Sequence, residues 1–281
     1  MTGDLPIGIS DFTQLRRQKK RYVDKTDHIG SLAEICGSYH LTAPAGVGKS
    51  LLVSTLASLF ENGLTDFQGL FIEKRWSDRT YPVVRIAGGC LRRFESRQAF
   101  DASYRQLLIA SFGKVGFRFN HHTSEPIESQ LCRWMDEQAD ASLVLLIDDY
   151  DVPFREARSI PCLTDYIHCR LLDFFTQVKS CAGVLRFMLM TGTVVQPDVL
   201  AEFQGVNLNH ISEQAELLGF TESEIRANFG DYLVGSNDED FVTPESRFKR
   251  LCEYNITDTP NATKSIFTPG AVLDFLMHSK S

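Results

Sequence analysis

The segment Ala43–Ser50, which reads APAGVGKS, constrains the fold of this chain more than any other feature of its sequence. It follows a strand-like run of residues and opens an amphipathic helix that begins at Leu51. Small residues at four of its positions let the backbone wrap around an anion and present N–H groups at the start of the helix. The segment therefore predicts a phosphate-binding loop between a strand and a helix.

The positions of this loop match a relaxed Walker A pattern with alanine in place of the first glycine. The amine of Lys49 is expected to reach the β- and γ-phosphates of a nucleotide, and the Ser50 hydroxyl to ligate Mg²⁺, so the predicted cofactors are ATP and Mg²⁺. A glycine-rich turn with an incidental lysine would have the same sequence pattern. A second motif is needed to distinguish a nucleotide-binding loop from such a turn. The residues predicted to bind nucleotide are Pro44, Ala45, Gly46, Val47, Gly48, Lys49, Ser50 and Leu51.

A second motif follows about 100 residues later. Leu143–Ile147 is apolar on both alternating faces, as a central parallel strand must be, and it ends in Asp148, Asp149, Tyr150 and Asp151. Asp148 is placed to hold Mg²⁺ through water or Ser50, as the acid of a Walker B motif does. Asp149 stands where many ATPases carry a glutamate that polarises the attacking water. The side chain of aspartate is one methylene shorter than that of glutamate, so the sequence predicts ATP binding more firmly than ATP hydrolysis.

The next apolar run, Val184–Met190, ends in Thr191, Gly192 and Thr193. A polar residue at the tip of such a strand senses the γ-phosphate in related folds, and Thr191 is predicted to take that role. A simple threonine–glycine turn is the alternative. The predicted catalytic residues are thus Lys49, Asp149 and Thr191, and the predicted metal ligands are Ser50 and Asp148.

Strand-like runs alternate with helical segments, a pattern typical of an α/β fold whose parallel sheet is covered on both faces. The expected strands are Tyr39–Ala43, Tyr81–Ala87, Leu143–Asp148, Val184–Thr191 and, more weakly, Leu208–Ser212. The expected helices are Ser50–Glu61, Ser96–Phe112, Ile127–Gln138 and Tyr166–Lys179.

The character of the chain changes after residue 218. Thr221–Glu224 is a capping box that should open a helix with Ile225 and Phe229 turned inward. Residues 237–240 read as a solvated loop, residues 259–261 as a turn, and a last helix should follow Thr268. We therefore expect a core over residues 1–218, with an N-terminal segment 1–35, and a small helical lid over residues 219–281.

These motifs, in this order, resemble the bacterial AAA-ATPase-like family, whose members are often joined to a C-terminal PD-(D/E)xK nuclease-like domain. The resemblance implies a three-layer P-loop NTPase core with sheet order 5-1-4-3-2, and residues 22–25 near the adenine. It also implies kinship with signal-transduction ATPases, which use nucleotide state as a switch. Asp149 stands where the family usually has glutamate. The segments that carry the resemblance are Leu5–Phe12, Tyr22–Thr26, Ala43–Ser50, Tyr81–Val84, Leu146–Pro153, Phe187–Gly192, Phe203–Asn207 and Gly219–Glu224.

A nuclease site of the PD-(D/E)xK type needs an acidic residue two positions before a lysine, because the carboxylate holds the metal and the amine steadies the activated water. None of the ten lysines of this sequence has Asp or Glu at that offset. Nuclease activity within these residues is therefore not expected.

The amino-acid composition excludes several other classes of protein. A hydrophobic fraction of 43% and a charged fraction of 23% exclude a mostly disordered chain, and a net charge of −7 argues against a general polyanion binder. No apolar run approaches the ~18 residues of a membrane span. The seven cysteines are odd in number and scattered, which predicts reduced, mostly buried thiols in a cytoplasmic protein.

Several other groups of residues have plain structural interpretations. The basic run Arg16–Arg21 favours a solvated helix face over a nucleic-acid contact. The pair His121 and His122, and the group Cys162, His168 and Cys169, lack zinc-ligand spacing and favour loop histidines and a packed thiol. An arginine finger could come in trans from a homo-oligomer or another protein, or in cis from Arg155, Arg158, Arg170 or Arg186.

The sequence thus predicts a Mg²⁺-dependent ATP-binding P-loop protein, an ATPase acting as a nucleotide-driven switch or motor subunit. One alternative is a non-hydrolysing ATP-binding signalling or scaffold module. Another, supported by family analogy alone, is the ATPase subunit of a DNA-processing or defence system.

Overall fold

The computed structural model describes residues 4–210, 217–233 and 266–278, and its centre is a five-stranded parallel sheet. The strands lie in the order β2-β3-β4-β1-β5, which confirms the expected order 5-1-4-3-2. Each neighbouring pair is parallel. Their bounds are β1 Gly37–Thr42, β2 Val83–Ala87, β3 Leu143–Asp148, β4 Leu185–Gly192 and β5 Val206–Asn207.

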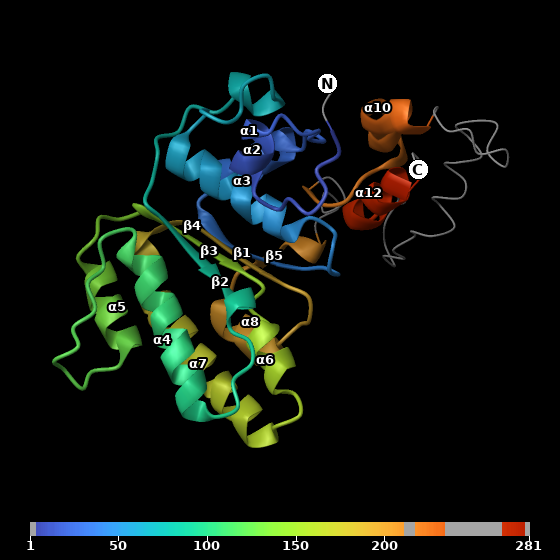
Figure 1. The fold of residues 1–281 in the computed structure, drawn as a ribbon. Coiled ribbons are helices and arrows are strands. Elements are labelled where there is room, and N and C mark those ends of the chain that lie inside the picture. The colour runs from blue at the N-terminus through green and yellow to red at the C-terminus, as the bar shows by residue number, and fades with distance from the viewer. Residues whose placement is uncertain (1–3, 211–216, 234–265, 279–281) are drawn as a thin grey trace.

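Helices cover both faces of this sheet and complete the predicted three-layer α/β fold (Figure 1). On one face lie α1 Phe12–Arg17, α2 Thr26–Glu34 and α3 Lys49–Asn62. On the other lie α4 Arg97–Gly113, α5 Ile127–Asp136, α6 Val152–Ala157, α7 Pro161–Ser180 and α8 Pro197–Phe203.

Strand β3 is buried on both sides, as its apolar sequence predicted. Val144 and Leu146 belong to the hydrophobic cluster under α1–α3, whereas Leu143, Leu145 and Ile147 belong to the cluster under α4–α8. Side chains that alternate between two cores fix the register of the strand, because a shift by one residue would exchange its two faces. The acids that follow β3 are therefore held at a defined point on the carboxyl edge of the sheet.

The fifth strand differs from its predicted position. Val206 and Asn207 pair with Tyr39 and His40 of β1, while Leu208–His210 form a 3₁₀ turn, and residues 211–212 lie outside the described residues. The Oδ1 atom of Asn209 accepts the Thr42 N–H at 2.9 Å, and its amide donates to the Thr42 carbonyl. The Asn209 side chain thus pairs with the backbone of Thr42, at the edge of β1 where a longer fifth strand was expected to pair.

The four predicted helices are confirmed as α3, α4, α5 and α7, with shifts at their ends. Helix α7 begins at Pro161, earlier than expected, because proline is favoured in the first turn of a helix. Helices α1, α2, α6 and α8 were not predicted. They are six to nine residues long, too short for the 3.6-residue period to stand out in a window of about 11 residues.

Beyond the sheet, α10 Glu222–Leu233 and α12 Pro269–His278 form a separate small cluster. The capping box is confirmed: the Thr221 N–H donates to the Glu224 carboxylate at 2.8 Å, and the Glu224 N–H to the Thr221 hydroxyl at 3.3 Å. Ile225 and Phe229 are fully buried, as predicted. Phe220 and Phe267 join the two segments by a pair of backbone hydrogen bonds. The expected loop at 237–240 and turn at 259–261 lie outside the described residues.

Replacing Phe229 by alanine should loosen this cluster without unfolding the sheet. Phe229 packs in a group that includes Ile225 and Val272 and is separate from the two sheet cores, so we expect a loss of about 3–5 kcal/mol from the cluster. Hydrogen exchange followed by mass spectrometry should show faster exchange in peptides of α10 and α12. The matched control is Phe71→Ala, a 57% exposed ring. Unchanged exchange in α10 would contradict this description.

The cysteines correct one sequence prediction. Of the six described, Cys36, Cys90, Cys162 and Cys169 are exposed, Cys132 is half-buried and Cys181 is buried, so the expectation of mostly buried thiols is wrong. The exposed thiols lie at the ends of helices and strands or on the polar face of α7. Apolar neighbours in the sequence do not reveal such positions, and this is why the cysteines were expected to be buried. Cys252 lies outside the described residues. No helix of the described part is long and apolar enough to cross a membrane.

Candidate functional site

The phosphate loop connects β1 to α3 at the carboxyl edge of the sheet. Gly46 and Gly48 have φ values of 80° and 104°, in the left-handed region that favours glycine. A Cβ at position 48 would meet nothing within 4 Å, so backbone conformation and not space requires glycine there. Gly48 is also the N-cap of the 14-residue α3 and provides no capping side chain. The positive end of this helix dipole therefore faces the loop without a built-in anion.

Lys49 links the loop to the neighbouring strand. Its Nζ donates to the carbonyls of Ala43 at 2.6 Å and Pro44 at 2.8 Å, and lies 3.5 Å from the Thr193 hydroxyl after β4. The side chain is buried, and this burial lowers the pKa of the Lys49 amine, while the nearby carboxylates of Asp149 and Asp148 oppose that shift. A buried amine held by neutral carbonyls is well placed to exchange them for an anion.

At the end of β3, Asp148 and Thr191 form a pair. The Thr191 hydroxyl, fully buried on β4, donates to Asp148 Oδ1 at 2.6 Å. This contact orients the carboxylate of Asp148, but neither side chain lines the cavity described below. Thr193, two residues further along the chain, does line the cavity, and sequence reasoning did not select it.

Asp149 does reach the cavity, and its backbone is unusual. Its φ is 55°, and its carbonyl oxygen would lie 2.3 Å from a Cβ at position 88, so Gly88 is required for the two backbones to approach. Burial, and then the neighbouring Asp148 carboxylate, raise the pKa of Asp149, while the Lys49 amine opposes the rise. Aspartate is among the non-glycine residues that adopt the left-handed region most readily, so Asp149 can hold this conformation at the cavity wall.

The third acid, Asp151, has a structural role. It is fully buried, and its two carboxylate oxygens accept the N–H groups of Thr193 and Val194, each at 3.0 Å. Its Oδ2 also lies 3.2 Å from the Nε of Arg155. Asp151 therefore fixes the loop that carries Thr193 and positions one arginine, which the DDYD letters alone did not indicate.

The structure separates the four candidate arginines. Arg186 is buried and binds the Ala33 carbonyl and Asp78, and Arg170 pairs with Glu128 and Asp101. Only Arg155 of the four lines the cavity that contains Lys49 and Asp149. Arg92, after β2, lines it too, and was missed because nothing in its local sequence marks it.

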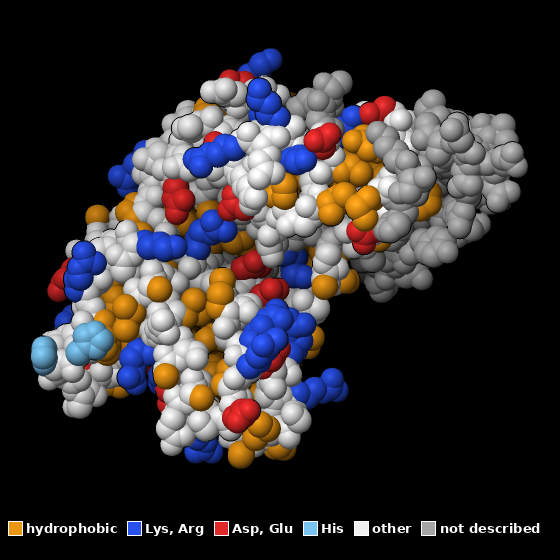
Figure 2. All heavy atoms as spheres, in the orientation of Figure 1, with side chains coloured by type: hydrophobic (Ala, Val, Ile, Leu, Met, Phe, Trp, Pro, Cys, Tyr) orange, Lys and Arg blue, Asp and Glu red, His pale blue; other side chains and the backbone are white. Residues whose placement is uncertain are grey.

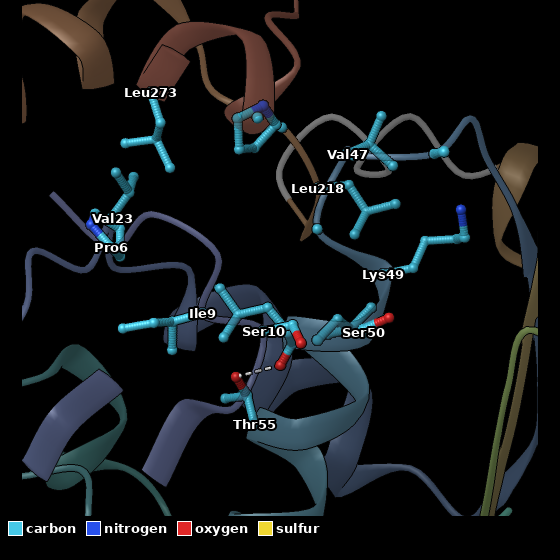
Figure 3. A pocket seen from close by; sticks show the side chains of 18 of the residues that line it. Pro6, Ile9, Ser10, Val23, Val47, Lys49, Ser50, Thr55, Leu218 and Leu273 are labelled. Atoms are coloured by element: carbon cyan, nitrogen blue, oxygen red, sulfur yellow. Dashed lines mark hydrogen bonds between the residues drawn. The ribbon is translucent and has the colours of Figure 1, made fainter. Parts of the chain in front are cut away.

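One cavity of about 530 Å³ is lined by the phosphate loop together with Asp149, Arg155 and Thr193. Figure 3 shows Lys49 and Ser50 at one end, whereas Pro6, Ile9, Val23 and Leu273 surround the other. A polar end with fixed N–H groups and an amine, joined to an apolar end, suits a ligand with a polyphosphate and a flat base. Of the predicted nucleotide-binding residues, Ala45–Leu51 line the cavity; Pro44 contributes its carbonyl to Lys49.

The N-terminal and C-terminal segments close this cavity together. The Gly219 N–H donates to the Val47 carbonyl at 3.0 Å, and the Gly270 N–H to the Gly46 carbonyl at 3.4 Å. Lys25 pairs with Glu224 at 2.8 Å, and Arg21 pairs with Asp231. The segment around α10 and α12 thus rests directly on the phosphate loop.

The basic run Arg16–Arg21 is only in part the solvated helix face expected of it. Helix α1 ends at Arg17, Arg16 donates to the Asp66 carbonyl at 3.0 Å, and Arg21 is buried against α10. Arg16 and Arg21 therefore hold elements together, whereas residues 17–19 are exposed, as expected of a solvated face. On the face drawn in Figure 2, the Lys and Arg side chains lie among Asp and Glu side chains.

A parallel sheet with order 5-1-4-3-2, a phosphate loop after β1 and acids at the tip of β3 defines a P-loop nucleotide-binding protein of the ATPase type. The model of the predicted AAA-ATPase family matches residues 6–198, and the chain belongs to this family.

The chain is also similar to one curated protein and to several solved structures. An uncharacterized protein in the vnfD 5′ region of Azotobacter chroococcum mcd 1 is 30% identical over 239 residues, which cover 82% of this chain and 46% of the relative. Among solved structures, Cdc6p from Pyrobaculum aerophilum is 15% identical with a TM-score of 0.36, covering 85% of this chain and 60% of that one. The Walker-type ATPase of Pyrococcus abyssi is 12% identical with a TM-score of 0.42, covering 89% and 64%. The chain spans about half the length of the curated relative.

Proposed function

We propose that the protein binds Mg²⁺–ATP in this cavity and hydrolyses it, using the nucleotide state as a switch or to drive a motor. The observation that carries the proposal is the meeting of Lys49, Ser50 and Asp149 in one cavity with a left-handed glycine loop. The adenine would lie at the apolar end, near Val23 and Leu273, and the phosphates at the end with Lys49.

Each residue has a distinct role in this proposal. The N–H groups around Gly46 and Gly48 would cradle phosphate oxygens, and the Lys49 amine would exchange loop carbonyls for them. Ser50 would ligate the metal, and Asp148, whose side chain does not line the cavity, would hold it through water, since hydroxyl and carboxylate oxygens are the groups Mg²⁺ prefers. The chemistry supplied by a bound Mg²⁺ is neutralisation of charge on the phosphate oxygens. Thr191 would then act by orienting Asp148, a role that its 2.6 Å hydrogen bond supports.

Asp149 would orient the attacking water. Its left-handed backbone and its close contact with Gly88 hold the short carboxylate at the cavity wall, which supports turnover despite the missing methylene. Burial raises the pKa of the Asp149 carboxylate, and a higher pKa makes a carboxylate a better proton acceptor. The decisive experiment is a steady-state ATPase assay with Mg²⁺.

We assign residues 1–218 to the catalytic core and residues 219–281 to a lid. The hydrogen bonds from Gly219 to Val47 and from Gly270 to Gly46 support a lid that responds to the occupancy of the loop. A cytoplasmic location is consistent with the exposed free thiols, which persist in a reducing compartment.

The alternative function is a non-hydrolysing switch, which the replacement of the usual glutamate by Asp149 favours. A rise in melting temperature with ATP, without any release of phosphate, would select this alternative. An ATPase subunit of a DNA-processing system rests on family analogy, and salt-dependent DNA binding is its test.

Arg155 supplies a prediction that separates cis from trans catalysis. Replacing it by alanine should lower kcat roughly 30-fold, the equivalent of about 2 kcal/mol for one charge-assisted hydrogen bond. Because Asp151 of the same chain positions Arg155, the rate per molecule should not depend on protein concentration. Arg158→Ala, in the same segment but away from the cavity, is the control. A rate that rises steeply with protein concentration would instead show that an arginine comes from a second copy.

A further inference from the structure

Two cysteines and a carboxylate converge at a point that the nucleotide site does not use. Cys132 Sγ lies 2.9 Å from Cys181 Sγ and 3.9 Å from Asp136 Oδ2. The three possible ligand atoms all lie within 4.8 Å of one another, and no other group of this kind occurs within residues 4–210, 217–233 and 266–278. The hydroxyl of Ser180 is also near, 3.4 Å from Cys132 Sγ and 3.6 Å from Cys181 Sγ.

The helices position these groups rigidly. Cys132 and Asp136 are four residues apart on α5, which places them on one face of the helix. Cys181 is the C-cap of α7, and its N–H donates to the Val178 carbonyl at 3.2 Å. Because Cys181 precedes β4, the group lies at the amino edge of the sheet, opposite the phosphate loop (Figure 1).

The electrostatics at this point favour a cation. Asp136 is the last residue of α5 and Cys181 caps α7, so the negative ends of two helix dipoles meet there beside a carboxylate. Cys132 is half-buried and Asp136 is exposed, which leaves a path for an ion from solvent.

The carboxylate of Asp136 separates a cation site from a simple pair of thiols. A disulfide would use Cys132 and Cys181 alone, whereas a thiophilic cation can take the two sulfurs and the carboxylate oxygen together, because all three ligand atoms lie within 4.8 Å of one another. A cation of this kind displaces the thiol protons as it binds.

We propose that Cys132, Asp136 and Cys181 bind a thiophilic divalent cation of the Zn²⁺ type, with water or the Ser180 hydroxyl as fourth ligand. Two thiolates and one carboxylate are established ligand types for zinc, and three protein ligands with one open position are typical of an accessible site. Sulfurs on a tetrahedral zinc lie about 3.8 Å apart, so the half-buried Cys132 side chain would rotate outward by about 1 Å.

Such a cation would fasten α5 to α7 at the start of the two central strands. The adjacent connections already run together, since the N–H groups of Ala141 and Ser142 donate to the carbonyls of Gly183 and Val184, each at 2.9 Å. A bound ion would extend this contact to the helix ends. It would stabilise the layer that carries β3 and β4, independently of whether ATP is bound.

The test uses the full chain, purified without metal and kept reduced with a phosphine. Zn²⁺ added against a chromogenic chelator should bind at one equivalent, and Co²⁺ should give the near-ultraviolet absorption of thiolate-to-cobalt charge transfer. Cys132→Ser should remove both signals. Asp136→Asn, an exposed change that leaves the fold intact, should weaken Zn²⁺ binding at least about tenfold.

Cys169→Ser, which removes an exposed thiol on α7, is the matched control and should bind Zn²⁺ like the unchanged protein. Zn²⁺ binding that persists unchanged in both Cys132→Ser and Asp136→Asn would overturn the proposal. So would a Cys132–Cys181 disulfide, seen by mass spectrometry in protein isolated without oxidant. Neither result would bear on the nucleotide site, whose test is ATP hydrolysis.

Discussion

Replacing Lys49 by alanine should lower kcat/KM for ATP by about 10²–10³-fold or more, the loss expected when one preorganised charged donor is removed from a phosphate site. In the structure this amine is buried at the polar end of the cavity, where it contacts only the loop carbonyls of Ala43 and Pro44 and approaches Thr193. Its replacement leaves no other buried cation at that position of the loop. Phosphate release and ATP binding by calorimetry should both decline.

The control for this prediction must separate lost chemistry from a misplaced loop. Lys114→Ala removes an exposed lysine at the end of α4 and should leave hydrolysis unchanged. Lys49→Met keeps the apolar stem of the side chain and should preserve the melting temperature while losing hydrolysis. If Lys49→Met retains full activity, the amine has no role in catalysis and the assignment of the loop is wrong.

Asp149→Asn should lower kcat by about 10²–10⁴-fold while ATP binding stays close to that of the unchanged protein, because a positioned base acts mainly in the chemical step. Asparagine matches aspartate in shape and tolerates the left-handed conformation with φ of 55°, so the substitution removes the charge and little else. Rapid-quench measurement of phosphate release, with the Kd for ATP measured in parallel, separates the two effects.

Two further variants sharpen the result. Asp149→Glu supplies the side chain that related ATPases usually carry and should retain hydrolysis. Asp165→Asn, an exposed acid on α7, should have no effect. Equal kcat in Asp149→Asn and in the unchanged protein would remove Asp149 from the mechanism, whereas no phosphate release from either protein would favour the non-hydrolysing alternative.

The sequence predicted those parts of the fold that depend on local pattern. The double burial of β3 follows from an uninterrupted apolar run, and the start of α10 follows from the spacing of Thr221 and Glu224. The phosphate loop is equally local, since its glycines and Lys49 are neighbours in the chain. Family resemblance added the strand order, which no local pattern contains.

The parts that could not be predicted depend on contacts between distant residues. Asn209 ends the edge of β1 through its side chain, and Arg21 is buried because α10 carries Asp231. Thr193 enters the cavity only because Asp151 fixes the loop after β4. Composition and spacing carry no record of such pairings, so the burial of Arg21 was missed.

The central claim is that this cavity is a nucleotide site, and a calorimetric titration of the full chain with ATP in the presence of Mg²⁺ tests it most directly. The account predicts one site per chain and, at about 100 times Kd, a stabilisation of about 2.7 kcal/mol that appears as a raised melting temperature. Absence of both heat and stabilisation with ATP, ADP and GTP alike would contradict it.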